Sequence, residues 1–391
     1  DTMNPAIKPR VAIGIFVFLL VIVLTIIVAV PVQTAWGIWG LAITELMLLA
    51  CAIVPALLLK WDLKEVFPVK IPSLRQLFGV LVLLTGSYLS VLTINMIVLY
   101  LFPQGLTDVS NVFLELFKSV PLPVALFIVA VMPAVCEECL HRGFILYNFQ
   151  GVGKWATVLA MGLIFGIFHL DPYRFLGTAV LGVLLTFIMV ETRNLLLPML
   201  FHLLNNAFSV LASLTSEPSA EVIRVPLTAV GVYLVVAAII PFIFLWGSRL
   251  LKSREECRNH PLSKRAKLFA IIVAIVLLIS GIAFAAAGIS QTPVFKTAFS
   301  QSVNKDTQPK VLVFSVEKDS SYLLDLKIQG SGVITKVVIS NDRGEEVYTA
   351  SGGAMTGNGY IDLEAGQYTV IISYQTDSAE YNPVSVNLLI K

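Results

Sequence analysis

Nine apolar runs recur along this 391-residue chain, and they constrain its fold more than any other feature. A helix of about 20 mainly apolar residues crosses the roughly 30 Å of hydrocarbon in a bilayer. The predicted spans are Val11–Pro31, Trp36–Leu59, Leu77–Phe102, Pro123–Phe149, Ala156–Leu170, Phe175–Val190, Leu195–Leu214, Leu227–Trp246 and Leu268–Ile289. The sequence therefore predicts a polytopic α-helical protein embedded in a lipid bilayer.

The composition agrees with this class and argues against others. Hydrophobic residues make up 57% of the chain and charged residues 13%, whereas soluble globular proteins have about 25% charged residues. The net charge of +2 is too small to predict a nucleic-acid partner. The four cysteines all lie outside the polar C-terminal quarter, so we expect no disulfide framework.

The loop charges predict an orientation. Lysine and arginine in short loops stay on the cytoplasmic side of a membrane. Every second loop is basic here, most clearly residues 60–75 and 249–267, whereas the alternate loops hold scattered charges. We therefore expect a multi-pass protein of the cell membrane with a cytoplasmic N-terminus. After nine crossings the C-terminus is extracytoplasmic.

The pattern changes after Ile289. Short segments such as 310–316 and 366–374 alternate apolar and polar residues, and turn residues separate them. This alternation predicts an all-β sandwich of about seven strands. The segment contains no catalytic triad, metal cluster or phosphate loop, so we expect it to bind an extracellular ligand or to act as a spacer. An outward-facing β-domain favours a bacterial cell-envelope protein.

Four regions follow from these patterns. Residues 1–76 hold two spans and a basic cytoplasmic loop, and residues 77–214 hold the helical core with the strongest intramembrane polar groups. Residues 215–289 add two spans and another basic loop, and residues 290–391 form the extracytoplasmic β-sandwich.

Ionisable side chains inside the spans are the main functional signal. Each costs a few kcal/mol at bilayer depth, so it marks a functional site or a buried pair. Three spans of nine hold nearly all of the strong polar groups, namely Glu137, Glu138, His141, Arg142, His169, His202, Asn205 and Asn206. A single buried histidine or asparagine usually links helices. Their concentration on three spans favours a common site.

Helical spacing predicts how the fourth span uses its charges. Glu138 and Arg142 are four residues apart, so they share a face and can form an ion pair. Glu137 points about 100° away from Glu138. It is therefore available for another partner, and His141 is the nearest local candidate.

The other two polar spans repeat the spacing. Phe165 and His169 are four apart, as are His202 and Asn206. If the three faces converge, a carboxylate can deprotonate a water while an imidazole and an amide stabilise an oxyanion. Alternatively, one glutamate and two histidines can hold a zinc ion with a bound water. Both alternatives predict hydrolysis.

Two other polar features point to less specific roles. Cys136 and Cys139 form a C-x-x-C pair, but a structural zinc site needs a second pair of ligands, and Cys51 and Cys257 are isolated. We interpret them as ordinary membrane-helix cysteines. Glu45 lies midway along the second span, where we expect pairing with another group and no catalytic role.

Three motifs carry a resemblance to a known family. Residues 137–142 read E-E-x-x-x-R, residues 165–169 read F-x-x-x-H and residues 202–206 read H-x-x-x-N. In this order and spacing they resemble the CAAX-protease and bacteriocin-processing family of intramembrane proteases, also called ABI. The resemblance covers roughly residues 77–210.

The resemblance implies a helical bundle whose polar cavity opens toward the cytoplasmic leaflet. It implies that Glu137 and His169 activate water and that His202 and Asn206 stabilise the oxyanion. Glu138, Arg142, Phe165 and Asn205 would support them. The family is classed as metalloproteases, and a metal-free glutamate mechanism is also argued for it. If a metal is used, Glu137, His169 and His202 would bind Zn²⁺.

The leading hypothesis is thus an intramembrane endopeptidase that acts on a peptide or a membrane protein. The alternative is a non-catalytic scaffold or sensor of the same fold whose β-domain binds an extracellular ligand. A transporter ranks last, because no inverted repeat is visible. One expectation conflicts with a shared site: in straight helices, Glu137 and His202 lie near mid-bilayer, whereas His169 lies near the outer end of its span.

Overall fold

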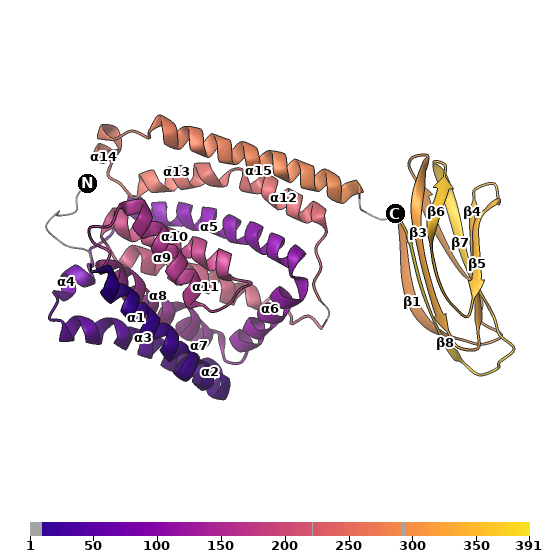
Figure 1. The fold of residues 1–391 in the computed structure, drawn as a ribbon, viewed down its shortest axis with the longest axis horizontal. Helices are drawn as coiled ribbons and strands as arrows, with labels where there is room; N and C mark the ends of the chain where they lie inside the picture. Colours follow the sequence, from indigo (N-terminus) through magenta and orange to yellow (C-terminus); the bar gives the residue numbers. More distant parts are fainter. Residues whose placement is uncertain (1–9, 221, 291–293) are drawn as a thin grey trace. The chain divides into compact units, whose positions relative to one another are not determined.

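The computed structural model describes residues 10–220, 222–290 and 294–391, and it divides into two compact units. Helices form the unit that ends at Ala287, and antiparallel strands form the unit that begins at Gly288 (Figure 1). Each unit has its own hydrophobic core.

The helical unit contains long apolar helices, short connecting helices and three π-helical segments. Their bounds are α1 Val11–Leu24, η1 Thr25–Ala29, α2 Val30–Trp36, α3 Ile38–Leu58, α4 Leu63–Val66, α5 Leu74–Leu101, α6 Pro103–Lys118, α7 Leu122–Leu126, η2 Phe127–Val131, α8 Met132–Glu138, η3 Cys139–Ile145, α9 Lys154–Phe168, α10 Phe175–Thr192, α11 Leu196–Ser213, α12 Leu227–Ala237, α13 Ile240–Leu250, α14 Arg254–Asn259 and α15 Lys264–Ser290.

Eight helices or continuous helical segments of the described chain are long and apolar enough to cross a membrane. They are α1 with η1 and α2, α3, α5, the segment from α7 to η3, α10, α11, α12 with α13, and α15. The fifth predicted span, Ala156–Leu170, corresponds to α9, an apolar helix of 15 residues that is too short to count among these eight. The predicted multi-pass helical fold is confirmed. A helix of that length rises about 22 Å, so α9 is shorter than the hydrocarbon layer.

The loops after the second, fourth, sixth and eighth predicted spans contact one another. The side chain of Asn194, between α10 and α11, donates a hydrogen bond of 2.9 Å to the carbonyl of Lys70, between α3 and α5. Glu191 at the end of α10 forms ion pairs with Lys154, the first residue of α9, and with Lys252, in the loop after α13. These contacts gather the basic loops of the sequence at one end of the bundle.

The loops after the third, fifth and seventh predicted spans meet at the opposite end of the helical bundle. Asn111 of α6 donates a hydrogen bond of 2.9 Å to the carbonyl of Ser219, in the loop after α11. Arg174, in the loop after α9, stacks on Phe113 of α6. Helix α6 therefore covers the loops at this end of the bundle, including the loop that follows α9.

Close helix contacts depend on glycine at a few positions. Gly182 of α10 lies against Gly162 of α9, where a Cβ on Gly182 would come within 3.0 Å of the neighbouring Cα. On another side of the unit, α12 and α13 lie between α5 and α15 (Figure 1). There a Cβ on Gly281 would lie 2.7 Å from the backbone nitrogen of Val235. Such small-residue contacts let membrane helices pack backbone to backbone.

The β unit is a sandwich of two four-stranded antiparallel sheets. The strands are β1 Phe295–Val303, β2 Lys310–Val316, β3 Ser320–Gly330, β4 Ile334–Asn341, β5 Glu346–Gly352, β6 Ala354–Leu363, β7 Gly366–Gln375 and β8 Asn382–Ile390. One sheet has the order β1-β8-β3-β6 and the other β2-β7-β4-β5. The predicted sandwich is confirmed, with eight strands instead of about seven. Alternate residues such as Leu326, Val337, Val370 and Leu388 fill its core.

The glycine contact between α12 and α15 generates a first prediction. We expect Gly281→Ala to destabilise the protein by about 1–3 kcal/mol, because the added methyl group meets backbone that cannot move aside locally. Gly177→Ala is the matched control, since its Cβ would meet Val91 at an ordinary 3.6 Å. Thermal unfolding of both purified variants in detergent measures the effect. Equal unfolding temperatures for the two variants would contradict the prediction.

Candidate active site

The ring of Phe165 on α9 is the meeting point of the polar spans. Its centroid lies 4.8 Å from the ring of His169, 5.1 Å from that of His141 and 5.9 Å from that of His202. The guanidinium carbon of Arg142 lies 4.3 Å from the same centroid. Side chains from η3, α9 and α11 therefore converge around one aromatic ring, and the three predicted polar faces lie together.

Glu138 connects two of these elements. Its side chain is fully buried, and Oε1 accepts a hydrogen bond of 2.9 Å from Nη1 of Arg142. The same oxygen lies 2.8 Å from Nδ1 of His202 on α11. Nη2 of Arg142 donates to the carbonyl of Gly182 on α10 at 3.1 Å. The predicted ion pair is present, and it continues into a network that the sequence did not indicate, because Glu138 and His202 are 64 residues apart.

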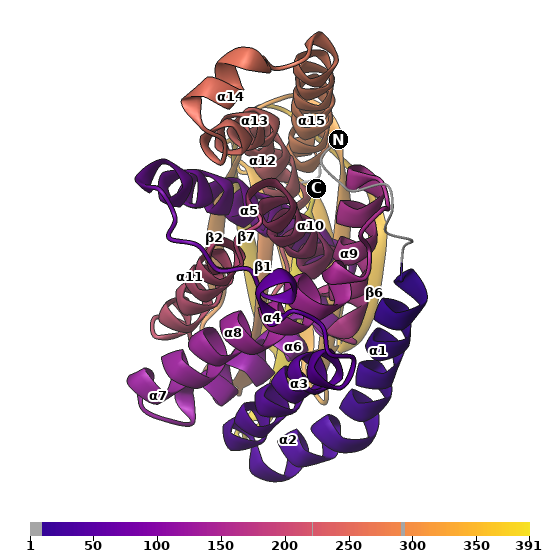
Figure 2. The same ribbon diagram turned by 90° about the vertical axis from the view of Figure 1, so that its left-hand side faces the viewer.

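Glu137 lies beside this network without joining it. Its side chain is buried, and Oε2 has no hydrogen-bond partner among the described residues. Its carboxylate interacts electrostatically with His202, Glu138, Arg142 and Arg174. Helix α8, which carries Glu137, lies between α3 and α11 (Figure 2). Oε2 of Glu138, Nε2 of His141 and Nε of Arg142 likewise have no hydrogen-bond partner among the described residues, so the buried cluster as a whole leaves several polar atoms unsatisfied.

The predicted local partner of Glu137 is wrong. Nδ1 of His141 lies 2.9 Å from the backbone carbonyl of Glu137, so this ring bonds the main chain and not the carboxylate. His141 is fully buried and packs edge-on against Phe165 and Phe168. In a helix, a side chain four residues on lies directly above the earlier backbone carbonyl, so residue spacing alone does not distinguish the two bonds.

His169 forms the C-cap of α9. Its Nδ1 lies 2.8 Å from the carbonyl of Phe165, which leaves Nε2 as the nitrogen available to a ligand. The depth conflict expected from straight helices is absent, because His169 and His202 contact the same Phe165 ring. The reason is the length of α9, since its 15 residues end short of a full membrane crossing.

Asn206 is tied to the π-helical segment that precedes α8. Its Nδ2 donates a hydrogen bond of 2.9 Å to the carbonyl of Val129, and its Oδ1 accepts one of 3.1 Å from Nδ2 of Asn205. Pro133 lies four residues after Val129 and has no N–H to donate to that carbonyl in the usual helical pattern. The amide of Asn206 is therefore held in one orientation, with one N–H still available.

π-Helical turns flank the site on both sides. Segments η2 and η3 enclose the two turns of α8 that carry Glu137 and Glu138. Such turns are rare and occur mostly as single insertions in α-helices, frequently at functional sites. The extra residue in each turn changes which side chains share a face. Regular spacing still predicts the pair of Glu138 with Arg142, but it does not predict the contacts of these side chains with other helices.

Two further charged residues lie near Glu137. Glu45 of α3 is 2% exposed, its Oε2 has no hydrogen-bond partner among the described residues, and it interacts electrostatically with Glu137. We expected Glu45 to pair with another group, but Oε2 of Glu45 forms no hydrogen bond with any described residue. Arg174 also interacts electrostatically with Glu137, and it belongs to none of the three sequence motifs. Its only sequence signal is its position five residues after His169.

The donor set for zinc was tested against this geometry. Nδ1 of both His169 and His202 is held by an oxygen, as in many metal-binding histidines, and this leaves Nε2 of each ring for a ligand. However, no three His, Cys, Asp or Glu side chains within residues 10–220, 222–290 and 294–391 form a group that could hold a metal ion. As placed, the residues do not fit the three-ligand zinc site of hydrolases, and we derive no step through a metal.

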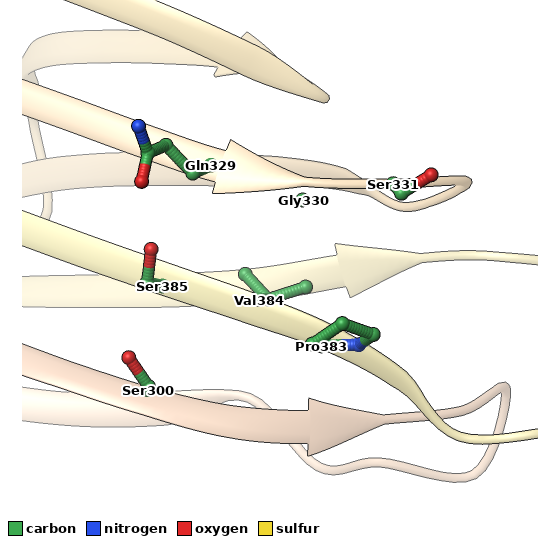
Figure 3. A pocket seen from close by; sticks show the side chains of 7 residues that line it. All are labelled: Ser300, Gln329, Gly330, Ser331, Pro383, Val384 and Ser385. Carbon is green, nitrogen blue, oxygen red and sulfur yellow. The ribbon is translucent and has the colours of Figure 1, made fainter.

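The β unit has a shallow groove of about 360 Å³ on the sheet that contains β1, β8 and β3 (Figure 3). It is lined by Ser300, Gln329, Gly330, Ser331, Pro383, Val384 and Ser385. None of these residues carries an acidic, basic or imidazole group, so the groove offers hydrogen bonds and no acid–base chemistry. The predicted extracellular ligand of this unit stays a prediction.

The Glu138 network generates a second prediction. We expect Arg142→Met to destabilise the protein by about 3–5 kcal/mol, because it leaves a fully buried carboxylate without its ion-pair partner. Lys118→Met is the control, since it removes an ion pair with Glu217, whose side chain is 83% exposed. Exposed pairs contribute little. Denaturation in mixed micelles measures both variants, and losses of similar size would contradict the prediction.

Comparison with known proteins adds an independent observation. Residues 119–208 match the family model described as Type II CAAX prenyl endopeptidase Rce1-like. The matched segment begins before α7 and ends after Asn206, so it contains every residue placed around Phe165 above. No curated protein matches the chain.

Proposed function

We propose that this membrane protein, whose residues 119–208 belong to the type II CAAX prenyl endopeptidase family, hydrolyses peptide bonds within the bilayer. Its substrate is a peptide or a membrane-associated protein. One observation carries the proposal: polar groups of three helical segments meet around Phe165, and beside them Glu137 holds a buried oxygen that has no hydrogen-bond partner among the residues the structure describes.

Glu137 acts as the general base in this proposal. Its carboxylate takes a proton from water as the water oxygen attacks the carbonyl carbon of the peptide bond. The same proton then passes to the leaving amine nitrogen as the carbon–nitrogen bond breaks. Nε2 of His169 holds the water, because Nδ1 of that ring is already bonded to the carbonyl of Phe165. The electron pair of the broken carbon–nitrogen bond stays on the amine nitrogen, which receives the proton from Glu137, and the carboxylate of Glu137 is regenerated.

His202 and Asn206 stabilise the oxyanion in this proposal. Asn206 has one amide N–H left after its bond to Val129. His202 donates from Nε2 only if its ring carries two protons, since Nδ1 faces Glu138. Oε1 of Glu138, which also accepts from Arg142, lies 2.8 Å from Nδ1 and fixes the direction of the ring. Preorganised donors of this kind commonly contribute the largest part of the rate enhancement.

We also propose the orientation predicted by the loop charges. The basic loops that gather at one end of the helical unit are cytoplasmic, together with the N-terminus. The β unit is extracytoplasmic. The lipid bilayer surrounds the apolar faces of the helices. Residues 1–76, 77–214 and 215–289 form the membrane part, and residues 290–391 form the extracytoplasmic part. A bacterial cell envelope suits this organisation.

The third prediction tests the general base. We expect Glu137→Gln to lower turnover by about 10²–10⁴-fold while the protein stays folded, because an amide cannot accept the proton of water. Glu115→Gln makes the same chemical change on the exposed face of α6 and is expected to leave turnover unchanged. The assay uses purified full-length protein and a mixture of N-acetylated apolar octapeptides, with products identified by mass spectrometry. Undiminished cleavage by Glu137→Gln would remove the proposal.

The fourth prediction separates the metal-free mechanism from a zinc mechanism. Since Glu137, His169 and His202 do not form a metal-binding group among the described residues, we expect turnover to survive dialysis against a strong zinc chelator. Elemental analysis of the dialysed sample provides the control for metal content. Loss of turnover that is restored by added Zn²⁺ would instead support Glu137, His169 and His202 as ligands.

A further inference from the structure

The β unit carries a groove of about 360 Å³ that the proposed reaction does not use. Within it, Ser300 of β1 and Gln329 of β3 each lie directly opposite Ser385 of β8. Neighbouring strands are about 4.8 Å apart, and Figure 3 shows the three side chains in one row. The groove therefore presents two hydroxyl groups and one amide side by side.

The three side chains of this row point away from the core of the sandwich. Val384 and Ile328 precede two of them and are each 1% exposed, and successive residues of a strand face opposite sides of the sheet. Within residues 294–391, the three side chains form no hydrogen bond with another residue. By contrast, the side chains of Asn304 and Thr376, in loops at the same end of the unit, are hydrogen-bonded. The row is thus free to bind a ligand.

An exposed aromatic ring lies close to the row. Tyr381 is 69% exposed and precedes Pro383, one of the groove residues, by two positions. Two residues of extended chain span about 7 Å. A tyrosine ring offers an apolar face together with a hydroxyl group. It can therefore cover the apolar side of a ligand whose polar groups bond the row.

The chemistry of the groove disfavours two other classes of ligand. The backbone of β8 is paired with β1 on one side and with β3 on the other, so a peptide strand finds no free edge there. None of the lining residues is charged, so an anion finds no counter-charge in the groove.

Neutral sugars match what the groove offers. Hydroxyl and amide groups both donate and accept hydrogen bonds, and sugar hydroxyl groups do the same. The C–H face of a pyranose ring is apolar and suits an aromatic ring. Exposure to solvent alone does not account for the polar row, because the outer face of the other sheet exposes Val311 and Val313.

We propose that this groove, with Tyr381 beside it, binds a neutral polysaccharide. Ser300, Gln329 and Ser385 exchange hydrogen bonds with the hydroxyl groups of adjacent sugar residues, and Tyr381 stacks on the C–H face of a sugar ring. The inference does not rest on the proposed protease function, because the row belongs entirely to the β unit.

A glycan array tests the class of ligand. Fluorescently labelled full-length protein in nanodiscs is applied to neutral glucans, mannans, galactans and xylans, to uronate-containing and sulfated glycans, and to uncharged peptides. Labelled nanodiscs without protein give the background. We expect binding to at least one neutral polysaccharide and none to the peptides. We also expect Glu137→Gln to bind as the wild type does, which keeps this test separate from the test of peptide hydrolysis.

Variants then assign the binding to the groove. By biolayer interferometry, Gln329→Ala and Tyr381→Ala are each expected to raise the Kd of the bound glycan about three- to tenfold, as for the loss of one hydrogen bond or one aromatic contact. Gln375→Ala, on an exposed position of the other sheet, is the matched glutamine control. Tyr360→Ala is the tyrosine control, since Tyr360 is 79% exposed and lies opposite Leu323, six residues before Gln329 on β3. Both controls are expected to keep the wild-type Kd.

Three results would overturn the inference. The first is an array on which no neutral polysaccharide is bound above the background. The second is binding confined to the anionic glycans or to the peptides. The third is an unchanged Kd in the double variant Gln329→Ala/Tyr381→Ala, which would place the bound glycan elsewhere on the protein. Both replaced side chains are exposed, so the double variant is expected to unfold at the wild-type temperature.

Discussion

A single buried carboxylate organises the helical unit around its candidate site. Glu138 bonds Arg142 within its own segment and His202 on α11, and Arg142 continues to the carbonyl of Gly182 on α10. An isolated charge at this depth is strongly unfavourable, so the acid and its partners must come together when the helices pack. The network thereby fixes the relative positions of three segments and the ring of His202. Glu137, on the neighbouring face of α8, and Glu138 itself each keep one oxygen that no described residue satisfies.

Irregularities of the helix backbone position the other side chains of the candidate site. The π-helical segments η2 and η3 interrupt the regular pattern on each side of α8, and Pro133 removes a donor that a regular helix would direct at Val129. Asn206 binds that carbonyl and is oriented by it. The short helix α9 brings His169 to the same Phe165 ring as His202. Departures from regular helix geometry therefore position several of the side chains proposed to carry the reaction.

The helical and β units divide the chemistry between them. The described side chains with acid–base potential at buried positions lie in the helical unit, inside or beside the segment that matches the endopeptidase family. The groove of the β unit offers only hydroxyl, amide and apolar groups. The proposal that the helical unit is a protease therefore does not depend on the function of the β unit.

The sequence by itself determined the membrane class, the apolar spans, the change to a β-sandwich and the ion pair between Glu138 and Arg142. All of these depend on residues close together in the chain, where hydrophobic length and helical period act directly. The tertiary structure decided the contact of Glu138 with His202, the bond of Asn206 to Val129, the position of Arg174 and the true partner of His141. The bonds of Glu138 and Asn206 join segments far apart in the chain, so they depend on how the helices pack. His141 lies four residues after Glu137, where spacing alone does not distinguish the carboxylate from the backbone carbonyl.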